Sequence, residues 1–234
     1  MKIVERPSPN FNERGAVVDL LILHYTGMQT AEEALRRLCD PAAKVSAHYT
    51  IDEDGTVYRH VAETKRAWHA GVSAWAGASN INDRSIGIEL VNPGHEWGYR
   101  PFAEAQMAAL EALALDIVTR HPIRPAFVLG HSDVAPQRKE DPGELFDWAR
   151  LARAGIGLWP DFAAMPSDVP KDAAAVQGLL AEIGYEVPRT GALDDATRAV
   201  VIAFQRHFRP ARCDGALDAE TLARIATVAA AVGG

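Results

Sequence analysis

Short apolar runs that alternate with amphipathic helical segments constrain the fold of this chain most strongly. Val17–Leu23 is apolar on both alternating faces except at Asp19, which is typical of a strand buried between two layers. Ala126–Leu129 is a second run of this kind, and a histidine follows each of them, His24 and His131. Strands separated by helices predict a layered α/β domain with some parallel pairing, in which functional sites lie beyond the carboxyl ends of the strands.

Two helices are expected to cover this sheet. Thr30 and Glu33 form a capping-box signature that opens a helix over residues 31–40. A longer helix is predicted where apolar residues recur every three or four positions until Pro122 ends the pattern. Its stripe consists of Ala103, Met107, Leu110, Ala114 and Ile117.

A hairpin and one further strand complete the predicted sheet. Ala47–Asp52 and Thr56–Val61 are strand-like runs joined by a turn at Gly55, which supplies the positive φ that a tight hairpin requires. Ser85–Val91 alternates, so that three branched apolar residues share one face while Glu89 lies on the other. One carboxylate therefore interrupts an otherwise apolar strand. The fold class predicted for this part is a mixed central sheet flanked by helices.

The chain divides into two expected domains. Residues 155–171 are rich in glycine and proline and predict a linker between a first domain, residues 1–154, and a second, residues 172–234. In the second, Gly191–Thr197 recurs as Gly215–Thr221, and each copy places an aspartate at a helix N-cap position. The apolar stripes before and after these copies predict three short helices in a small bundle.

Composition limits the classes of partner. The net charge of −7 on 234 residues gives no global electrostatic reason to expect nucleic acid or an anionic membrane. Cys39 and Cys213 fall in different predicted domains and match neither a disulfide framework nor a zinc-thiolate pattern. The N-terminal residues lack the apolar segment of a secretory signal, and no run approaches the roughly 20 residues that span a bilayer. We therefore expect a cytoplasmic monomer, with the periplasm as the alternative location.

The segment Gly130–Gly143 carries the strongest chemical signal. A histidine and an aspartate ten residues apart, His131 and Asp141, can reach one metal ion if the loop curls back, and His24 could be a third ligand. Two neutral imidazoles and one carboxylate leave the fourth position of tetrahedral Zn²⁺ open, as in hydrolytic sites. Taken singly, each is more often an ordinary loop or turn residue. Together they favour a zinc site.

Two further residues have candidate catalytic roles. Glu89 is the candidate general base, because a carboxylate on a largely desolvated strand face tends toward a raised pKa. The alternative is an edge-strand glutamate that faces water. Lys139 would stabilise the oxyanion of a tetrahedral intermediate. The alternative for Lys139 is a solvated loop lysine.

Aromatic and imidazole side chains are candidate substrate contacts. Trp68, His69 and Trp75 fall in a loop-like segment, where exposed aromatics beside a polar site suit stacking on sugar or peptide. The alternative is a hydrophobic cover over the core. His48 lies in a predicted strand that could approach the metal. We expect Tyr25, His48, Trp68 and His69 to contact substrate.

At these residues the chain resembles the zinc-dependent N-acetylmuramoyl-L-alanine amidases, whose fold is shared by peptidoglycan recognition proteins and phage amidase-type lysozymes. The resemblance covers about residues 15–150. It rests on five motifs in order: Leu23-His24-Tyr25-Thr26, Ser46-Ala47-His48-Tyr49, Trp68-His69-Ala70-Gly71, Ser85-Ile86-Gly87-Ile88-Glu89-Leu90, and Gly130-His131-Ser132-Asp133 through Lys139-Glu140-Asp141-Pro142-Gly143. It implies cleavage of the bond between the lactyl group of muramic acid and L-alanine. It also implies His24, His131 and Asp141 as zinc ligands, Glu89 as base and Lys139 as oxyanion stabiliser.

Two positions separate subgroups of this family. Some relatives carry Cys at the third ligand position, and this chain has Asp141, as bacterial recycling enzymes do. Several relatives have Tyr in the hairpin strand where this chain has His48. Residues 172–230 resemble a peptidoglycan-binding three-helix domain, which would raise the local substrate concentration or shape one side of the cleft. The alternative is a bundle that only packs on the first domain.

Three other functions stay open at this point. A recognition protein without catalysis would lack a metal ligand, and none is missing. A zinc peptidase acting elsewhere on the stem peptide would use the same polarised water. A wall-remodelling amidase would act in the periplasm on sacculi. In the cytoplasm only soluble turnover fragments are available, so we expect anhydro-muropeptides of peptidoglycan recycling as the substrate.

Overall fold

The computed structural model describes residues 3–233; residues 1, 2 and 234, which the expected domains include, lie outside the described range. A six-stranded mixed sheet forms the centre of the first domain. In spatial order its strands are β1 (Ile3–Glu5), β5 (Val57–Arg59), β4 (Tyr49–Ile51), β9 (Ser85–Leu90), β3 (Leu20–Tyr25) and β10 (Val128–Gly130). Only the β4–β5 hairpin is antiparallel among these pairs, so the prediction of a mixed α/β sheet is confirmed.

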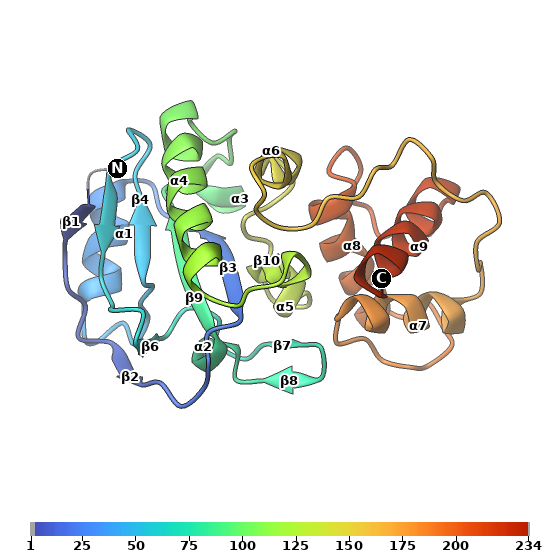
Figure 1. Cartoon of the computed structure of the whole chain (residues 1–234), viewed down its shortest axis with the longest axis horizontal. Coiled ribbons are helices and arrows are strands. Elements are labelled where there is room, and N and C mark those ends of the chain that lie inside the picture. Colours follow the sequence, from blue (N-terminus) through green and yellow to red (C-terminus); the bar gives the residue numbers. More distant parts are fainter. Residues whose placement is uncertain (1–2, 234) are drawn as a thin grey trace.

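Helices cover both faces of this sheet. Figure 1 shows α4 (Glu104–Arg120) across the near face and α1 (Ala31–Cys39) behind the strands. Thr30 caps α1 by accepting a hydrogen bond from the Glu33 N–H at 3.2 Å, as its sequence predicts. The shorter elements of this domain are α2 (Ile81–Arg84), α3 (Gly94–Trp97), the 3₁₀ turn Pro125–Phe127, α5 (His131–Val134) and α6 (Trp148–Arg153).

The two central strands are displaced along the chain from their predicted positions. β3 begins at Leu20 rather than Val17 and runs through His24 to Tyr25. Ladder pairing with β9 starts at Leu20, which is opposite the first residue of that strand. Before it, the Asp19 N–H donates to the Arg84 carbonyl at 2.9 Å, and Val17 is 71% exposed. β10 likewise starts two residues late. His24 is therefore a strand residue, paired with Glu89 of β9 one position after the pairing of β3 with β10 ends.

Five small strands were not predicted. One of them is β1, the edge strand of the central sheet. β2 (Phe11–Glu13) pairs with β6 (Lys65–Ala67), and β7 (Ala74–Trp75) pairs with β8 (Ala78–Ser79), both antiparallel. Each has only two or three residues, which is too short for a period-two pattern to be recognised.

The second domain is the expected three-helix bundle, formed by α7 (Ala173–Ile183), α8 (Asp195–Phe208) and α9 (Ala219–Gly233). The two repeat copies cap the last two helices. Asp194 accepts from the Thr197 N–H at 2.8 Å, and Asp218 accepts from the Thr221 N–H at 2.9 Å. The N-cap roles predicted from the repeat are confirmed.

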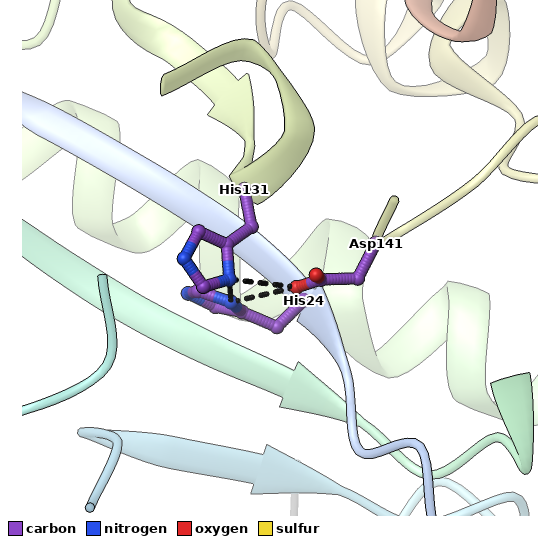
Figure 2. A group of neighbouring side chains, drawn as sticks. All are labelled: His24, His131 and Asp141. Carbon is purple, nitrogen blue, oxygen red and sulfur yellow. Dashed lines mark hydrogen bonds and ion pairs between the residues drawn. The ribbon is translucent and has the colours of Figure 1, made fainter. Parts of the chain in front are cut away.

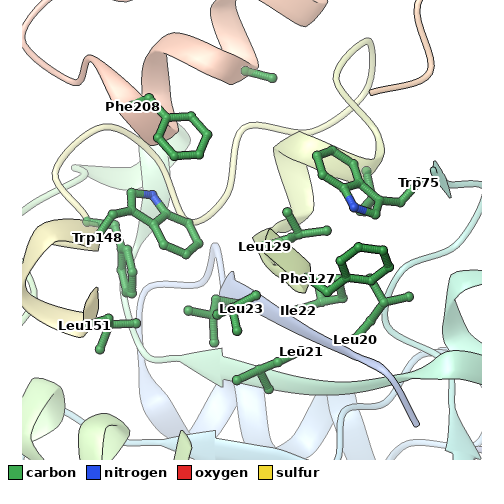
Figure 3. Packing of buried hydrophobic residues seen from close by; sticks show 14 of the residues in the cluster. Leu20, Leu21, Ile22, Leu23, Trp75, Phe127, Leu129, Trp148, Leu151 and Phe208 are labelled. Carbon is green, nitrogen blue, oxygen red and sulfur yellow. The ribbon is translucent and has the colours of Figure 1, made fainter. Parts of the chain in front are cut away.

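The bundle packs directly on the first domain. One continuous cluster of buried apolar residues joins the sheet to the bundle. Figure 3 shows Phe208 of α8 close to Trp148, with Trp75 and Leu129 on the first-domain side of the same layer. Within the described residues, no helix has both the length and the apolar character needed to cross a membrane.

Candidate active site

Three buried side chains converge on one point beside the carboxyl end of β3 (Figure 2). His24 comes from β3, His131 from the first position of α5, and Asp141 from the loop that follows. The His24 Nδ1 atom lies 3.0 Å from His131 Nδ1 and 2.9 Å from Asp141 Oδ2, and the latter two atoms are 3.1 Å apart. The loop does curl back as the metal hypothesis requires, because the Asp141 carbonyl accepts a hydrogen bond from the Ser132 N–H at 2.9 Å.

This donor set fits Zn²⁺. Two ligand atoms on tetrahedral zinc, each about 2.0–2.1 Å from the ion, lie about 3.3 Å apart, close to the separations of these three atoms. Two imidazole nitrogens and one carboxylate oxygen are ligand types that zinc prefers. Within residues 3–233, this is the one group of three or more such side chains whose donor atoms come together in this way.

The second ring nitrogen of His131 fixes its tautomer. His131 Nε2 lies 3.0 Å from the Ala70 carbonyl oxygen, which can only accept, so Nε2 carries the proton. The lone pair of His131 is therefore on Nδ1, the atom that faces Asp141. Arg138 donates to the same Ala70 oxygen at 2.9 Å and to the Val72 oxygen at 2.6 Å, which fixes the position of this acceptor.

A chain of hydrogen bonds fixes the tautomer of His24 in the same way. The Ser85 hydroxyl donates to the Ile81 carbonyl at 2.7 Å, so its oxygen accepts from His69 Nε2 at 3.1 Å. His69 Nδ1 is then an acceptor, and the His24 Nε2–H group donates a hydrogen bond to it at 3.0 Å. The lone pair of His24 is left on Nδ1. Partners of this kind behind a ligand orient it and raise its basicity.

Charges in the group suit a cation. Burial lowers the pKa of His24 to about 4, so its imidazole is neutral at pH 7. Burial alone would raise the pKa of the Asp141 carboxyl, but His131 and His24 outweigh it and hold this pKa well below its usual range. The site therefore presents the Asp141 carboxylate beside two imidazoles, of which that of His24 is neutral.

Glu89 lies beside this group. It is the cross-strand partner of His24 in the parallel β3–β9 pair, so the two side chains project from the same face of the sheet. Its Oε2 atom is buried without a hydrogen-bond partner. Burial raises the pKa of this carboxyl well above its usual range, the Asp141 charge adds to the effect, and Lys139 opposes it. A buried carboxylate oxygen without a donor is poised to accept a proton from a bound molecule.

An open cleft of about 640 Å³ exposes these groups. It is lined by His24, Glu89, His131, Lys139 and Asp141, and also by Tyr25, Trp68, His69, Arg37 of α1 and His95 of α3. The Tyr25 hydroxyl lies 3.0 Å from His95 Nδ1, and Trp68 Nε1 donates to Asn12 Oδ1 at 2.6 Å. Eight of the nine predicted site residues thus meet in one place.

His48 is the exception, and its predicted contact with substrate is corrected here. Its side chain is fully buried and is not part of the cleft wall. His48 Nδ1 accepts from the Gly87 N–H at 3.0 Å, and Nε2 lies 3.1 Å from the Lys65 carbonyl oxygen. Both nitrogens are used in joining β4 to neighbouring segments, and burial lowers the pKa of this imidazole to about 3.

His69 belongs to the cleft wall but has both ring nitrogens bonded within the protein. A hydrogen bond from His69 to substrate would require one of these bonds to break. The observed role of His69 is therefore its hydrogen bond with His24. His95 is a further residue of the cleft wall, and its ring stacks on Tyr99 at 4.3 Å between centroids. His95 was missed because it lies neither at a strand end nor in a patterned segment.

Comparisons with known proteins agree with this geometry. The family model described as N-acetylmuramoyl-L-alanine amidase matches residues 14–144, and that of a peptidoglycan binding domain matches residues 170–225. The N-acetylmuramoyl-L-alanine amidase AmiD of Escherichia coli (strain K12) is 41% identical in an alignment of 225 residues that covers 88% of this chain and 80% of the relative. The 1,6-anhydro-N-acetylmuramyl-L-alanine amidase AmpD of Citrobacter freundii is 44% identical over 108 residues, 46% of this chain and 56% of the relative.

Two solved structures extend the likeness to both domains. The complex of E. coli AmiD with the substrate anhydro-N-acetylmuramic acid-L-Ala-D-gamma-Glu-L-Lys has a TM-score of 0.80 at 38% identity, covering 94% of this chain and 96% of that one. AmpDh3 from Pseudomonas aeruginosa in complex with anhydromuramic pentapeptide has a TM-score of 0.82 at 36% identity, covering 91% of each chain.

Proposed function

Because this chain belongs to the N-acetylmuramoyl-L-alanine amidase family, we propose that it is a zinc hydrolase that cleaves the amide bond between the lactyl group of N-acetylmuramic acid and the L-alanine of the stem peptide. One observation carries the proposal. His24, His131 and Asp141 bring three metal-donor atoms within 3.1 Å of one another, next to a buried carboxylate with an unpartnered oxygen.

The metal would be held by His24 Nδ1, His131 Nδ1 and Asp141 Oδ2. Bound there, Zn²⁺ would supply a Lewis acid that polarises the scissile carbonyl and lowers the pKa of water to about 7. The hydrogen bonds from His131 to Ala70 and from His24 to His69 hold both rings with the lone pair toward the ion.

Glu89 would transfer the proton of the attacking water, and Lys139 would stabilise the negative charge on the carbonyl oxygen. Glu89 Oε2 accepts the proton of the attacking water and returns it to the departing amine nitrogen of L-alanine. Burial raises the pKa of this carboxyl, so it holds the proton more firmly than an exposed carboxylate would before passing it to the nitrogen. Lys139 lines the same cleft and donates to the oxyanion that develops on the carbonyl oxygen.

Soluble anhydro-muropeptides are the proposed substrate class. The AmiD and AmpDh3 structures that match both domains hold anhydromuramic peptides. The cleft of about 640 Å³ falls in the range of small-molecule sites, which suits one sugar with a short peptide. Tyr25 and Trp68 provide aromatic surface for the sugar or peptide, and Arg37 is an exposed cation for the stem-peptide carboxylates.

The domain boundaries and the location stay proposals. We assign catalysis to residues 1–154, a linker to residues 155–171 and peptidoglycan binding to residues 172–234, and the two matched family ranges support this division. Recycling in the cytoplasm is the proposed setting, and cell fractionation with an antibody against the chain tests it. Recovery with the periplasmic fraction would favour wall remodelling instead.

A product analysis tests the activity. The purified protein is incubated with anhydro-muramyl tripeptide and, separately, with intact sacculi, with and without a chelator, and products are identified by mass spectrometry. We expect free tripeptide with an intact L-alanine N-terminus from the soluble fragment, and none after chelation. Cleavage inside the stem peptide would identify a peptidase. Absence of cleavage of both substrates would refute the hydrolase and favour a protein that only binds peptidoglycan. Activity confined to sacculi would refute soluble anhydro-muropeptides as the substrate.

A further inference from the structure

The loop that carries most of the site is in contact with the C-terminal bundle at both of its ends. We name this loop, Gly130–Glu144, the metal loop. It includes α5 and contributes His131, Lys139 and Asp141 to the site. None of the described residues of the bundle lines the cleft. Its side chains instead reach the metal loop from behind, at Asp133 and at Glu140.

Asp133 is the main junction. Its Oδ1 accepts from the Tyr185 hydroxyl at 2.6 Å, and its Oδ2 accepts from His207 Nδ1 at 2.8 Å and from the Gly130 N–H at 2.8 Å. Asp133, Tyr185 and His207 are only 1%, 3% and 3% exposed, so water does not substitute for these donors. A carboxylate from one domain is thus satisfied by two side chains of the other.

The two donors are themselves fixed by packing. The His207 ring stacks on Trp148 of α6 with centroids 3.7 Å apart and on Phe208 at 4.0 Å. The Tyr185 ring meets Trp75 edge-on at 4.9 Å. Trp148 and Phe208 lie together in Figure 3, where the bundle meets the sheet domain. The donors therefore cannot follow Asp133 if it moves.

From Asp133 the restraint reaches the metal ligands through short covalent and hydrogen-bonded steps. Asp133 is in the same single turn of helix as His131, and the intervening Ser132 N–H binds the Asp141 carbonyl at 2.9 Å. At the other end, Arg206 of α8 pairs with Glu140 at 3.3 Å, between Lys139 and Asp141 in the chain. Both metal ligands of this loop are therefore within two residues of a contact with the bundle.

We propose that the bundle acts as a clamp on the metal loop, and that Tyr185 and His207 are positioning residues that set zinc affinity through Asp133. This rests on the proposed zinc site. A peptidoglycan-binding role gives no reason for these two side chains to be buried against the catalytic domain. Partners behind metal ligands typically change metal affinity by about 10–100-fold.

The test uses the full-length protein and two isosteric changes. Tyr185→Phe removes one hydroxyl, and His207→Phe keeps the stacked ring while removing Nδ1. For each variant and for the pair, we measure the zinc dissociation constant by competition with a chromophoric chelator. We also measure hydrogen exchange of residues 130–144 in the metal-free protein. We expect the dissociation constant to rise by about 10–100-fold and the loop amides to exchange faster, with kcat recovered at saturating zinc.

Val200→Ala is the matched control. Val200 is fully buried in α8, so this change weakens the bundle core and removes no hydrogen bond or ion pair to the metal loop. We expect its zinc affinity and loop exchange to match the wild type. The clamp is refuted if Tyr185→Phe and His207→Phe also match the wild type. If the wild-type protein binds no zinc, the zinc site fails, while exchange of the metal-free loop still tests the clamp.

Discussion

His24 and Glu89 are cross-strand partners on neighbouring parallel strands, β3 and β9. Their side chains project from the same face of the sheet, one as a candidate metal ligand and the other as a buried carboxylate with an unpartnered oxygen. The backbone hydrogen bonds of the sheet therefore set the separation between the candidate metal ligand and the candidate base. Neither depends on a mobile loop for its position.

Glu89→Gln separates the base from the metal site. The amide has nearly the same shape but cannot take a proton, so we expect kcat to fall by about 10²–10⁴-fold while zinc content is unchanged. Zinc is measured by mass spectrometry of the dialysed protein. Glu96→Gln, at an exposed carboxylate on the cleft wall, is the control and should retain kcat. Full activity of Glu89→Gln would remove Glu89 from the mechanism.

Lys139→Met tests the oxyanion role and has a pH signature. Loss of this donor should lower kcat by about 10²–10³-fold. As a base, Glu89 works only when deprotonated, so activity is lost as pH falls through its raised pKa. Lys139 lowers that pKa, so its removal should move the acidic limb of the kcat profile to higher pH. Lys171→Met, in the linker, should change neither kcat nor the acidic limb. An acidic limb that does not shift in Lys139→Met would contradict an effect of Lys139 on the pKa of Glu89.

Gly87→Ala should weaken zinc binding without touching a ligand. A Cβ atom at Gly87 would lie 2.5 Å from the His69 ring, which must then shift and disturb its hydrogen bond with His24. We expect zinc affinity to fall by about 10–100-fold, measured by chelator competition. Gly178→Ala is the control, since the nearest atom to its added methyl group is 3.6 Å away. Equal zinc affinity in the two variants would show that His69 does not hold His24.

Zinc should stabilise the fold. A ligand that binds only the folded state at 1,000 times its dissociation constant adds about 4 kcal/mol. We expect chelation to lower Tm of the wild-type protein, with recovery on adding zinc, as followed by scanning calorimetry. Asp141→Asn should lose most of this zinc-dependent shift. A wild-type Tm that is indifferent to zinc and chelator would argue against a metal bound by these residues.

Glu63 should make stability depend on acid pH. Burial raises the pKa of this carboxyl, but hydrogen bonds from Arg120, His121 and Tyr49 outweigh burial and lower the pKa to about 2. The stabilisation is complete above about pH 4.5 and disappears as pH falls through about 2. At about 1.4 kcal/mol per pH unit, it amounts to about 3 kcal/mol.

Urea unfolding at several pH values measures this contribution. Glu63→Gln should be about 2–3 kcal/mol less stable than the wild type at pH 7, with the difference shrinking toward pH 2. Glu182→Gln, at an exposed position on α7, should be neutral throughout. A constant difference between wild type and Glu63→Gln at all pH values would mean that lost packing, not charge, causes the effect.

Most of the candidate active site could be predicted from the sequence because its residues lie on, or directly after, regular strands. His24 follows from its place at the end of an apolar run, Glu89 from strand alternation, and His131 with Asp141 from one short segment after a strand. Strand boundaries were less accurate, since pairing with β9 and not apolarity sets where β3 begins.

Residues whose roles arise from packing were not predictable. His48 was wrongly expected to meet substrate, because alternation does not show that its ring is covered by other segments. Asp133 meets Tyr185 and His207, which lie 52 and 74 residues away in sequence. Such contacts depend on how two domains dock, and no local pattern encodes that.

The shared burial of Asp133 limits how freely these domains can be exchanged. A catalytic domain fused to a different C-terminal module would keep the Asp133 carboxylate but lose both side-chain donors from the bundle. The new partner would have to supply equivalent donors, or Asp133 would have to change together with the module. Recombination between relatives should therefore succeed where Asp133, Tyr185 and His207 come from the same parent. A crossover in the linker separates Asp133 from the other two residues.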